Sequence, residues 1–399
     1  MGRRAARRAR SIDELRHLAR RRLPRIVYDF LDGGAEDETT LRSNVTSFRR
    51  HRFVPRVLRG VAERDTSVEL FGQRLAVPIL YAPIGLTALA HPGGEPAAAR
   101  AAARGGTTLV ASTAASYRIE ETAAATSTPP WFQLYPWGDR RVTGELLDRA
   151  AASGCRVLCV TVDVPVVGRR ERDLRNGFTV PLRVRPRQLV DVLRHPSWFG
   201  RLATHRRITF ANLLDIEVVP TQRALSLVAY ANQLNDPTTD WETIDWIRSR
   251  WDGPLLLKGI AHPVDVRRAV EHGVDGVVVS NHGGRQLDRM AASIDLLPGA
   301  VAAARGRLTV LLDGGIRRGA DVAVALALGA DAVLVGRPYL YGLAVGGEDG
   351  ALHALELLRT ELDRVMALVG ASCPDELTPD LVASVPAQAW ASQPPSTGT

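Results

Sequence analysis

The feature that most constrains the fold is a regular alternation, from residue 77 onward, of short apolar stretches with longer segments of helical composition. Most of these segments are rich in alanine, leucine and arginine and end in glycine, as a helix followed by a turn does. Apolar strands that alternate with helices predict a parallel sheet covered by helices. The eight stretches are Pro78–Pro83, Thr107–Ser112, Trp131–Tyr135, Val157–Asp163, Leu255–Ile260, Gly276–Asn281, Thr309–Gly314 and Ala332–Gly336.

Eight strand and helix units in about 260 residues match the size of a (β/α)8 TIM barrel. A doubly wound nucleotide-binding fold is the alternative. No two glycines in the chain are separated by a single residue, however, so the GxGxxG motif is absent, and neither GxxxxGKS nor GxxxxGKT occurs. We therefore predict an α/β fold with a TIM barrel over residues 77–377, an N-terminal helical extension over residues 11–76, and an insertion after the fourth strand at about residues 181–235.

The two ends of the chain differ in composition from the barrel. Residues 1–10 contain five arginines and no acidic residue, which predicts a basic, disordered arm. Ser11 is placed to cap a first helix, and a second helix is expected over Pro24–Leu31, before two glycines. Residues 378–399 are predicted to form a C-terminal tail whose proline-, serine- and threonine-rich end, from Ser392, is disordered.

The composition excludes several classes of protein. The three cysteines form no CxxC pair, and Cys155 and Cys159 flank a strand, so a core position is favoured over a metal site and a reduced, cytoplasmic protein is predicted. The N-terminus lacks the apolar segment of a signal peptide, and Asp321 and Asp331 interrupt the longest apolar stretch, so no transmembrane helix is expected. No nucleic-acid-binding motif accompanies the net charge of +8, so no nucleic-acid partner is predicted.

Part of the insertion is basic and amphipathic. Pro181–Pro220 contains seven arginines and three acidic residues. Arg187, Arg194 and Arg201 recur every seven residues, on one helical face opposite apolar residues, although Pro196 must interrupt such a helix. This pattern suits an anionic membrane surface, with the protein peripheral to the cytoplasmic face. A solvated lid over the barrel mouth is the alternative, and the sequence favours neither.

Every predicted strand ends in polar residues or glycine. In a TIM barrel the carboxyl ends of the strands surround the active site. Eight polar ends are hard to explain by stability alone, so they predict a functional site at this rim. The residues concerned are Pro83, Ile84, Gly85, Ser112, Thr113, Gln133, Tyr135, Thr161, Asp163, Lys258, Asn281, His282, Asp313, Gly314, Gly315, Gly336 and Arg337.

The last two strand ends indicate a phosphate group. Backbone N–H groups at Gly314, Gly315 and Gly336 lie where TIM barrels commonly bind phosphate. Arg317 and Arg337 add charged donors. A phosphorylated cofactor or substrate is therefore predicted.

The fifth strand carries an isolated ammonium group. Lys258 is the only lysine among 51 lysine and arginine residues, which indicates a position where a planar guanidinium would not serve. Hydroxyl and amide groups at Ser112, Gln133 and Thr161 suit hydrogen bonds to a planar heterocycle. A flavin would use both features, because an ammonium beside its ring stabilises the reduced anion.

Four further residues suit chemistry on a small carboxylate-bearing alcohol. His282 and Asp163, at the same rim, suit a base and the carboxylate that orients it. Arg170 and Arg285 suit a bidentate clamp for a substrate carboxylate. Together these residues predict the oxidation of such an alcohol.

These residues lie in motifs that resemble those of the FMN-dependent 2-hydroxy acid dehydrogenase and oxidase family, which includes glycolate oxidase, L-lactate dehydrogenases and mandelate dehydrogenases. The resemblance runs from about Ser11 to Leu377, and Asp240–Ile260 with the insertion is most similar to the membrane-associated, quinone-reducing bacterial lactate dehydrogenases. The motifs are Trp131–Tyr135, Thr161–Asp163, Leu257–Gly259, Ser280–Asp288, Asp313–Arg317 and Gly336–Pro338.

The resemblance implies FMN as the cofactor, oxidation of an (S)-2-hydroxy acid to the 2-oxo acid, quinone or O2 as the electron acceptor, and a homotetramer. It implies that His282 removes a substrate proton while Asp163 stabilises the imidazolium. Arg285 and Arg170 would hold the carboxylate, and Tyr135 would contact the hydroxyl. The implied cofactor contacts are Pro83, Ile84, Gly85, Ser112, Gln133, Thr161, Lys258, Ser280, Asp313, Gly315, Arg317, Gly336 and Arg337.

Two positions depart from the family in the substrate pocket. A tyrosine that helps bind the carboxylate is replaced by Phe30, and the tryptophan of glycolate oxidase is replaced by Ala114. Both changes make the pocket larger and more apolar, so we expect a bulkier substrate than glycolate, including aromatic 2-hydroxy acids. Ile84 also stands where a small polar residue is common.

Two alternatives stay open at this point. One is an FMN oxidoreductase that acts on a non-standard substrate, such as a peptide-derived precursor. The other is a flavin-binding or membrane-attached module without turnover, against which the complete set of His282, Asp163, Arg285 and Arg170 argues.

Overall fold

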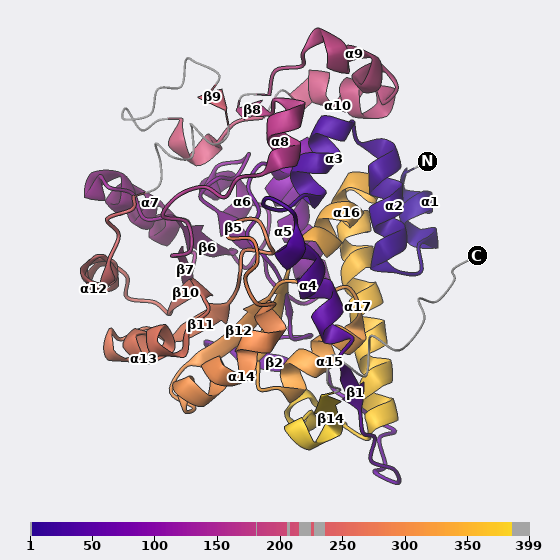
Figure 1. The fold of residues 1–399 in the computed structure, drawn as a ribbon, viewed down its shortest axis with the longest axis vertical. Coiled ribbons are helices and arrows are strands. Elements are labelled where there is room, and N and C mark those ends of the chain that lie inside the picture. The colour runs from indigo at the N-terminus through magenta and orange to yellow at the C-terminus, as the bar shows by residue number, and fades with distance from the viewer. Residues whose placement is uncertain (1, 181, 206–207, 215–224, 227–235, 385–399) are drawn as a thin grey trace.

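A barrel of eight parallel strands forms the centre of the computed structural model, which describes residues 2–180, 182–205, 208–214, 225–226 and 236–384 (Figure 1). Each strand pairs with its neighbours in chain order, and a parallel bridge from Tyr81 to Leu109 joins the first strand to the second and closes the ring. The predicted TIM barrel is therefore confirmed. The strands are β4 (Ile79–Tyr81), β5 (Val110–Ser112), β6 (Trp131–Leu134), β7 (Leu158–Thr161), β10 (Leu255–Ile260), β11 (Gly276–Val279), β12 (Thr309–Asp313) and β13 (Ala332–Val335).

Helices surround the barrel and connect its strands (Figure 1). They are α5 (Gly94–Arg104), α6 (Ile119–Ala123), α7 (Arg140–Ala152), α12 (Trp241–Arg250), α13 (Pro263–Glu271), α14 (Ser293–Ala304), α15 (Gly319–Ala327), α16 (Arg337–Gly346) and α17 (Glu348–Val369). Short 3-10 turns occur at η1 (Thr87–Leu89), η2 (Ala211–Leu213), η3 (Pro374–Glu376) and η4 (Pro379–Leu381).

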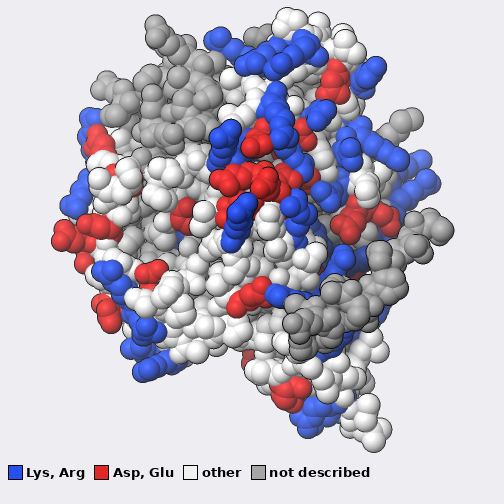
Figure 2. All heavy atoms as spheres, viewed as in Figure 1, with Lys and Arg blue, Asp and Glu red and all other residues white. Residues whose placement is uncertain are grey.

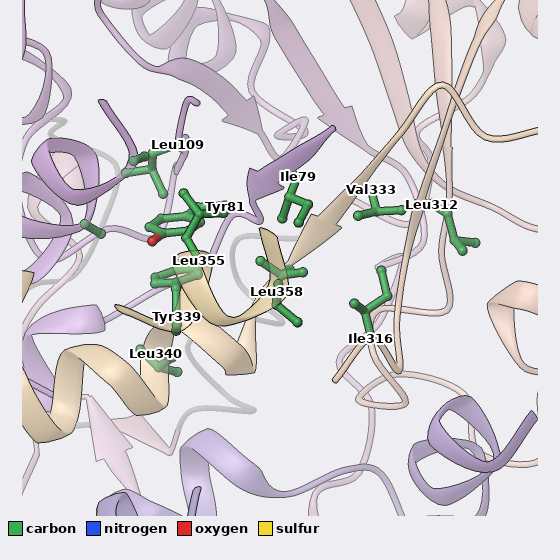
Figure 3. Close-up of a cluster of buried hydrophobic side chains, with 14 of the residues drawn as sticks. Ile79, Tyr81, Leu109, Leu312, Ile316, Val333, Tyr339, Leu340, Leu355 and Leu358 are labelled. Atoms are coloured by element: carbon green, nitrogen blue, oxygen red, sulfur yellow. The ribbon is translucent and has the colours of Figure 1, made fainter. Parts of the chain in front are cut away.

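The main hydrophobic core lies between the strands and these helices. Figure 3 shows this layer where Ile79 and Tyr81 of β4 lie near Tyr339 of α16 and Leu355 of α17. The rings of Tyr81 and Tyr339 stack with their centroids 4.4 Å apart. The buried Tyr81 hydroxyl donates to the carbonyl of Ala351 at 2.7 Å, so packing this tyrosine leaves no polar atom unsatisfied.

A hairpin closes the amino end of the barrel. It consists of β2 (Val68–Leu70) and β3 (Gln73–Leu75). Phe71 at its turn meets the ring of Trp131 edge to face at 5.7 Å, and the Trp131 indole donates to Oε1 of Gln73 at 3.0 Å. Leu70 and Leu75 join the apolar side chains inside the barrel. Because these side chains fill the amino end of the barrel, a ligand can enter at the carboxyl ends of the strands.

The N-terminal extension contains the predicted helices α2 (Ile12–Arg22) and α3 (Arg25–Asp32), followed by α4 (Thr39–Phe48). Ser11 caps α2 as predicted, since its hydroxyl accepts from the backbone N–H of Glu14 at 3.2 Å. The prediction of a disordered arm over residues 1–10 is wrong, because Gly2–Arg8 forms α1. Ala6 and Ala9 are buried where α1 packs on α16 and α17, and such small side chains let the helices approach closely.

The predicted tail over residues 378–399 is also wrong in its first part. Val382–Ser384 forms β14, which pairs antiparallel with β1 (His51–Phe53). The extension over residues 11–76 is therefore not purely helical, because it supplies β1, β2 and β3. Residues 385–399, including the end from Ser392, lie outside the described residues.

The insertion contains α8 (Glu171–Asn176), β8 (Thr179–Val180), α9 (Pro186–Leu193), α10 (Pro196–His205) and β9 (Leu225–Ser226). The helix break predicted at Pro196 is present. The sequence predicts that the arginines of this segment lie on one helical face and the apolar residues on the opposite face. The apolar face of α9 is not fully buried against the core, because Leu189 and Leu193 are exposed, as Arg187 is. The side chain of Arg201 lies outside the described part of the chain.

Trp198 connects α10 to the barrel by a hydrogen bond, since its indole N–H donates to the carbonyl of Leu89 at 2.8 Å.

Figure 2 shows basic side chains along the upper edge of the molecule, where Figure 1 places α9. The described helices include none with the length and apolar character needed to cross a bilayer.

Candidate active site

A histidine and an aspartate meet at the carboxyl end of the barrel. His282 follows β11 with a φ of 57°, and Asp163 follows β7. Nδ1 of His282 lies 3.0 Å from Oδ1 of Asp163 and 3.2 Å from Oδ2. Because an ionised carboxylate only accepts hydrogen bonds, Nδ1 carries the proton and Nε2 is the acceptor. Gly259 of β10 permits this arrangement, since a Cβ there would lie 2.5 Å from that of Asp163.

Burial and pairing set the charges of these two groups. Burial lowers the pKa of His282 below its ordinary value, and the nearby Asp163 offsets only part of that decrease. Burial raises the pKa of Asp163, but the interactions with His282 and the charge of Lys258 together more than offset the increase, so this pKa is lowered. At neutral pH the imidazole is therefore neutral and the carboxylate ionised, as a general base requires.

Two guanidinium groups lie beside this pair. Arg285 donates from Nη1 to the carbonyls of Phe30 and Gly33 at 2.8 and 2.9 Å. Arg170 donates from Nε to the carbonyl of Arg285 at 3.3 Å and from Nη2 to Oε1 of Gln286 at 3.4 Å. Within the described part of the chain, neither forms an ion pair with a carboxylate. Burial lowers the pKa of both groups, and the charge of Arg170 lowers that of Arg285 further. Such a pair suits an anionic ligand.

Tyr135 lies at the end of β6, where its backbone N–H donates to Oγ1 of Thr113 at 3.2 Å. Burial, with a further contribution from the charge of Asp163, raises the pKa of Tyr135 to about 12. The phenol therefore stays protonated at neutral pH and can donate a hydrogen bond to a ligand.

Lys258 lies at the centre of the same end. Its ammonium is 2.9 Å from Oδ2 of Asp313 and donates to Oγ of Ser280 at 3.0 Å. Burial lowers the pKa of Lys258, but the charges of Asp313 and Asp163, together with the hydrogen bond to Asp313, more than offset this decrease, so the pKa is raised. A fixed positive charge is thus held inside a buried site.

Several buried polar atoms on residues predicted for this site have no hydrogen-bond partner in the described structure. They are Nε2 of Gln133, Oγ1 of Thr161, Oδ1 of Asp313 and Nε of Arg337. Leaving a buried donor or acceptor unsatisfied costs about 1–3 kcal/mol, so these atoms fit a ligand that carries both donors and acceptors. The edge of a flavin ring, ribityl hydroxyls and a phosphate meet that requirement, so the residues present fit the predicted FMN.

The last two strand ends, which are predicted to bind phosphate, also have a role in packing. A Cβ at Gly315, where φ is 91°, would lie 2.0 Å from the carbonyl oxygen of Asn44 in α4. Close packing of α4 therefore requires this glycine regardless of any ligand. Arg337 begins α16 and donates to the carbonyls of Gly283 and Gly33 at 3.0 and 2.9 Å. Burial lowers the pKa of Arg337, and the N-terminus of α16 adds positive potential beside it.

Most predicted site residues line one cavity. Six lie behind it. Asp163 pairs with His282, Ser112 donates to Gln133 at 2.8 Å, and Ser280 accepts from Lys258. Asn281 exchanges amide hydrogen bonds with Asn44 at 2.8 Å, and Thr161 ends β7. The predicted residues that line the cavity are Phe30, Pro83, Ile84, Gly85, Thr113, Ala114, Tyr135, Arg170, Lys258, His282, Arg285, Asp313, Gly314, Gly315, Arg317, Gly336 and Arg337.

Sequence reasoning missed part of the cavity wall. Gln286 lies within the Ser280–Asp288 motif, yet its role was not predicted, and its amide bridges Arg170 to the carbonyls of Asp163 and Val166. Trp137, Val164, Val167, Phe210 and Leu213 also line the cavity. No local pattern marks these apolar residues as different from core residues.

Comparison with known proteins defines the family. A model of the FMN-dependent dehydrogenase family matches residues 19–384. The chain belongs to the FMN-dependent dehydrogenase family. FMN is the cofactor of this family, so the cofactor and the class of oxidoreductase predicted from the sequence are confirmed, as is oxidation of 2-hydroxy acids at the level of the family.

Relatives of this FMN-dependent dehydrogenase fall into several branches. Peroxisomal (S)-2-hydroxyacid oxidase GLO3 of Arabidopsis thaliana is 42% identical over 368 residues, 92% of this chain and 94% of that protein. L-lactate dehydrogenase of Chromohalobacter salexigens is 41% identical over 368 residues, 92% and 93% of the two chains. A crystal structure of the monotopic membrane protein (S)-mandelate dehydrogenase, 37% identical, superposes with a TM-score of 0.89 over 94% of this chain and 100% of that one.

Proposed function

We propose that the protein oxidises an (S)-2-hydroxy acid with an apolar, ring-sized side chain to the corresponding 2-oxo acid. The observation that carries this proposal is the largely buried His282 and Asp163 pair, which lies at the same cavity as two guanidinium groups that form no ion pair with a carboxylate of the described chain. A carboxylate and an adjacent hydroxyl are the two groups that such a set can hold together.

Each side chain has one task in this proposal. Arg285 and Arg170 bind the substrate carboxylate and fix the position of the hydroxyl beside Nε2 of His282. Tyr135 orients that hydroxyl by a hydrogen bond. Nε2 of His282 accepts a proton from the substrate, and Asp163 stabilises the imidazolium that results. The substrate loses two electrons and two protons in total: one proton goes to His282, and FMN, when bound, would take up the two electrons and the other proton.

We propose that residues of all eight strand ends hold FMN. Lys258 would place its charge beside the ring, and Arg317 and Arg337 would pair with the phosphate. The first strand end and the glycines of the last two would approach it by their backbone. The full set is Pro83, Ile84, Gly85, Ser112, Gln133, Thr161, Lys258, Ser280, Asp313, Gly315, Arg317, Gly336 and Arg337.

The preference for a larger side chain rests on Phe30 and Ala114, which both line the cavity. The ring of Phe30 stacks on Phe178 at 4.3 Å, and the guanidinium of Arg285 lies 5.3 Å from its centroid in a cation–π contact. Phe30 thus supports the arginine and offers apolar surface without a hydroxyl. Ala114 contributes only a methyl group to the wall of the same cavity, which leaves space for a larger substrate.

The test is anaerobic mixing of the FMN-loaded protein with (S)-mandelate, (S)-3-phenyllactate, L-lactate and glycolate, while the visible absorbance of oxidised flavin is followed. We expect the aromatic acids to bleach the flavin with the highest kcat/KM, and their R enantiomers to leave it oxidised. Absence of bleaching by every 2-hydroxy acid would contradict the proposal and favour a non-standard substrate, such as a peptide-derived precursor.

We also propose that α9 and α10 bring the protein to the cytoplasmic face of an anionic membrane, where a quinone accepts the electrons. In α9 and at its end, Leu189, Val190 and Leu193 are between 49% and 60% exposed, and Arg187 and Arg194 are exposed as well. Apolar and basic side chains together favour an anionic bilayer surface. The (S)-mandelate dehydrogenase of similar structure is a monotopic membrane protein.

Sedimentation with vesicles of phosphatidylglycerol or phosphatidylcholine tests this surface. We expect binding to the anionic vesicles only, and its loss in the double variant Leu189→Ser, Leu193→Ser. Leu368→Ser is the matched control, since Leu368 is 69% exposed on α17. Faster reoxidation of the reduced flavin by O2 than by a quinone would contradict the proposed acceptor.

We also propose that the protein forms a homotetramer. Light scattering would test this proposal, and the mass of a monomer would contradict it.

A further inference from the structure

Residues 208–214 of the insertion pack against the loop that follows β5. The backbone N–H of Ala211 donates to the carbonyl of Ala115 at 2.9 Å. Phe210, Asn212 and Leu213 are 5%, 1% and 1% exposed, whereas Leu214 is 44% exposed. This part of the insertion is therefore built into the barrel end, unlike the exposed face of α9.

Asn212 attaches the segment to the strand end. Its Nδ2 donates to the carbonyls of Ser112 and Thr113, both at 3.2 Å, and its Oδ1 accepts from the backbone N–H of Ile119 at 2.8 Å. Both amide hydrogens are thus used, and the amide is fixed in orientation. On the other side, Nη1 of Arg149 donates to the carbonyl of Asn212 at 2.8 Å.

These contacts place two apolar side chains at the cavity. Phe210 and Leu213, which flank the anchored residues, line the same cavity as His282 and Ala114. Ala114 belongs to the loop that Asn212 holds, so the segment lies next to the position where a small side chain leaves space. An apolar group on C2 of a substrate would fill that space and lose its contact with water.

We infer that Phe210 and Leu213 form the wall that selects the side chain of the substrate, and that Asn212 is the positioning residue that fixes this wall. The inference rests on the proposed oxidation of 2-hydroxy acids. It assigns to residues 208–214 of the insertion a role in substrate choice: a ring-sized apolar group contacts both side chains, whereas the methyl group of lactate reaches neither.

Three alanine variants test the wall and its anchor. Phe210→Ala and Leu213→Ala should each lower kcat/KM for (S)-mandelate by about tenfold or more, the range that loss of apolar pocket contacts produces. For L-lactate, kcat/KM should change less than about twofold, which leaves the ratio of the two substrates as the readout. Leu214→Ala, at the neighbouring exposed position, is the matched control and should leave the ratio unchanged.

Asn212→Ala should act on binding rather than on the chemical step. We expect a higher KM for (S)-mandelate, with kcat and FMN content close to those of the wild type. A role confined to stability would lower FMN content and affect both substrates equally.

The Kd of phenylacetate, which has no hydroxyl and cannot be oxidised, measures binding at the wall without turnover. It should rise about tenfold in Phe210→Ala, while the Kd of acetate stays constant.

The outcomes separate this inference from the proposed function. If the wild type oxidises 2-hydroxy acids but Phe210→Ala and Leu213→Ala keep the wild-type ratio and the wild-type Kd of phenylacetate, the wall assignment is overturned. If the wild type oxidises no 2-hydroxy acid, the proposed function fails and the inference fails with it.

Discussion

Replacing Asp163 by asparagine tests the proposed base most directly. The substitution keeps the size of the side chain and one oxygen, but it removes the charge that faces Nδ1 of His282 at 3.0 Å. Both side chains are largely buried, with exposed fractions of 14% and 18%, so water can replace little of the lost interaction. A hydrogen bond to a charged group contributes about 1.5–3 kcal/mol, which corresponds to a decrease in kcat/KM of about 10- to 150-fold.

The pH dependence of kcat/KM gives a second, independent test of how the charge of Asp163 acts on His282. Burial lowers the pKa of His282, and Asp163 opposes that effect. In Asp163→Asn the burial stays and the opposing charge is gone, so the pKa should fall further. A base must be unprotonated, so activity is lost as the pH falls through this pKa. The acid limb of the wild-type profile should lie below about pH 6.5, and that of the variant lower still.

The assay is stopped-flow reduction of bound FMN by (S)-mandelate under anaerobic conditions, over about pH 5 to 9. FMN content, measured from the visible spectrum, is the control for intact folding. A variant that retains FMN and more than about a third of the wild-type kcat/KM would refute the assigned role of Asp163. An acid limb that moves to higher pH would refute the electrostatic reasoning.

Other residues give predictions of different kinds. Phe30→Tyr restores a hydroxyl near Arg285 and should lower the KM of L-lactate by about tenfold, as one hydrogen bond to a charged group would; an unchanged KM would place Phe30 away from the carboxylate. Lys258→Met leaves Asp313 without its cation and should raise the Kd of FMN, measured by flavin fluorescence, by about tenfold or more; equal affinity would argue against a charge beside the ring. Asp32→Asn should lower the free energy of unfolding in urea by about 3 kcal/mol, because Asp32 accepts from Arg16 at 2.7 Å and from the Tyr341 hydroxyl at 2.6 Å. Burial raises the pKa of Asp32 but these hydrogen bonds lower it well below the ordinary value, so the difference from the wild type should be present above about pH 4 and shrink below it; a difference that grows in acid would contradict this account.

The barrel could be predicted from the sequence because its signal is local and repeated. Each strand is an apolar stretch that ends in polar residues, and the observed strands begin and end within a few residues of the predicted ones. The sequence also predicts that His282 and Asp163 lie near each other, since parallel strands in a barrel deliver their ends to one rim. It does not predict their distance of 3.0 Å or the burial that sets their pKa values, because both depend on how the whole rim packs.

What the sequence could not predict depends on contacts between distant segments. The composition of residues 1–10 predicts an arm because five arginines outweigh the signal of Ala6, which α1 buries against α16 and α17, and of Ala9, which is buried just after α1. β14 exists only because β1, more than 300 residues earlier, pairs with it. Asn212 belongs to no recognisable sequence motif. Its role was not predictable because its hydrogen-bond partners lie about 100 residues away in the chain, at Ser112, Thr113 and Ile119.

The buried ammonium of Lys258 has a practical consequence for chemical labelling. Its side chain is the only primary amine that the sequence offers beyond a terminal one, and it is 5% exposed and paired with Asp313. Amine-selective reagents therefore have a single internal target, and it lies at the floor of the barrel mouth. The rate of its modification, read by mass spectrometry as one added tag, would report how often that mouth admits a small electrophile, without any engineered probe.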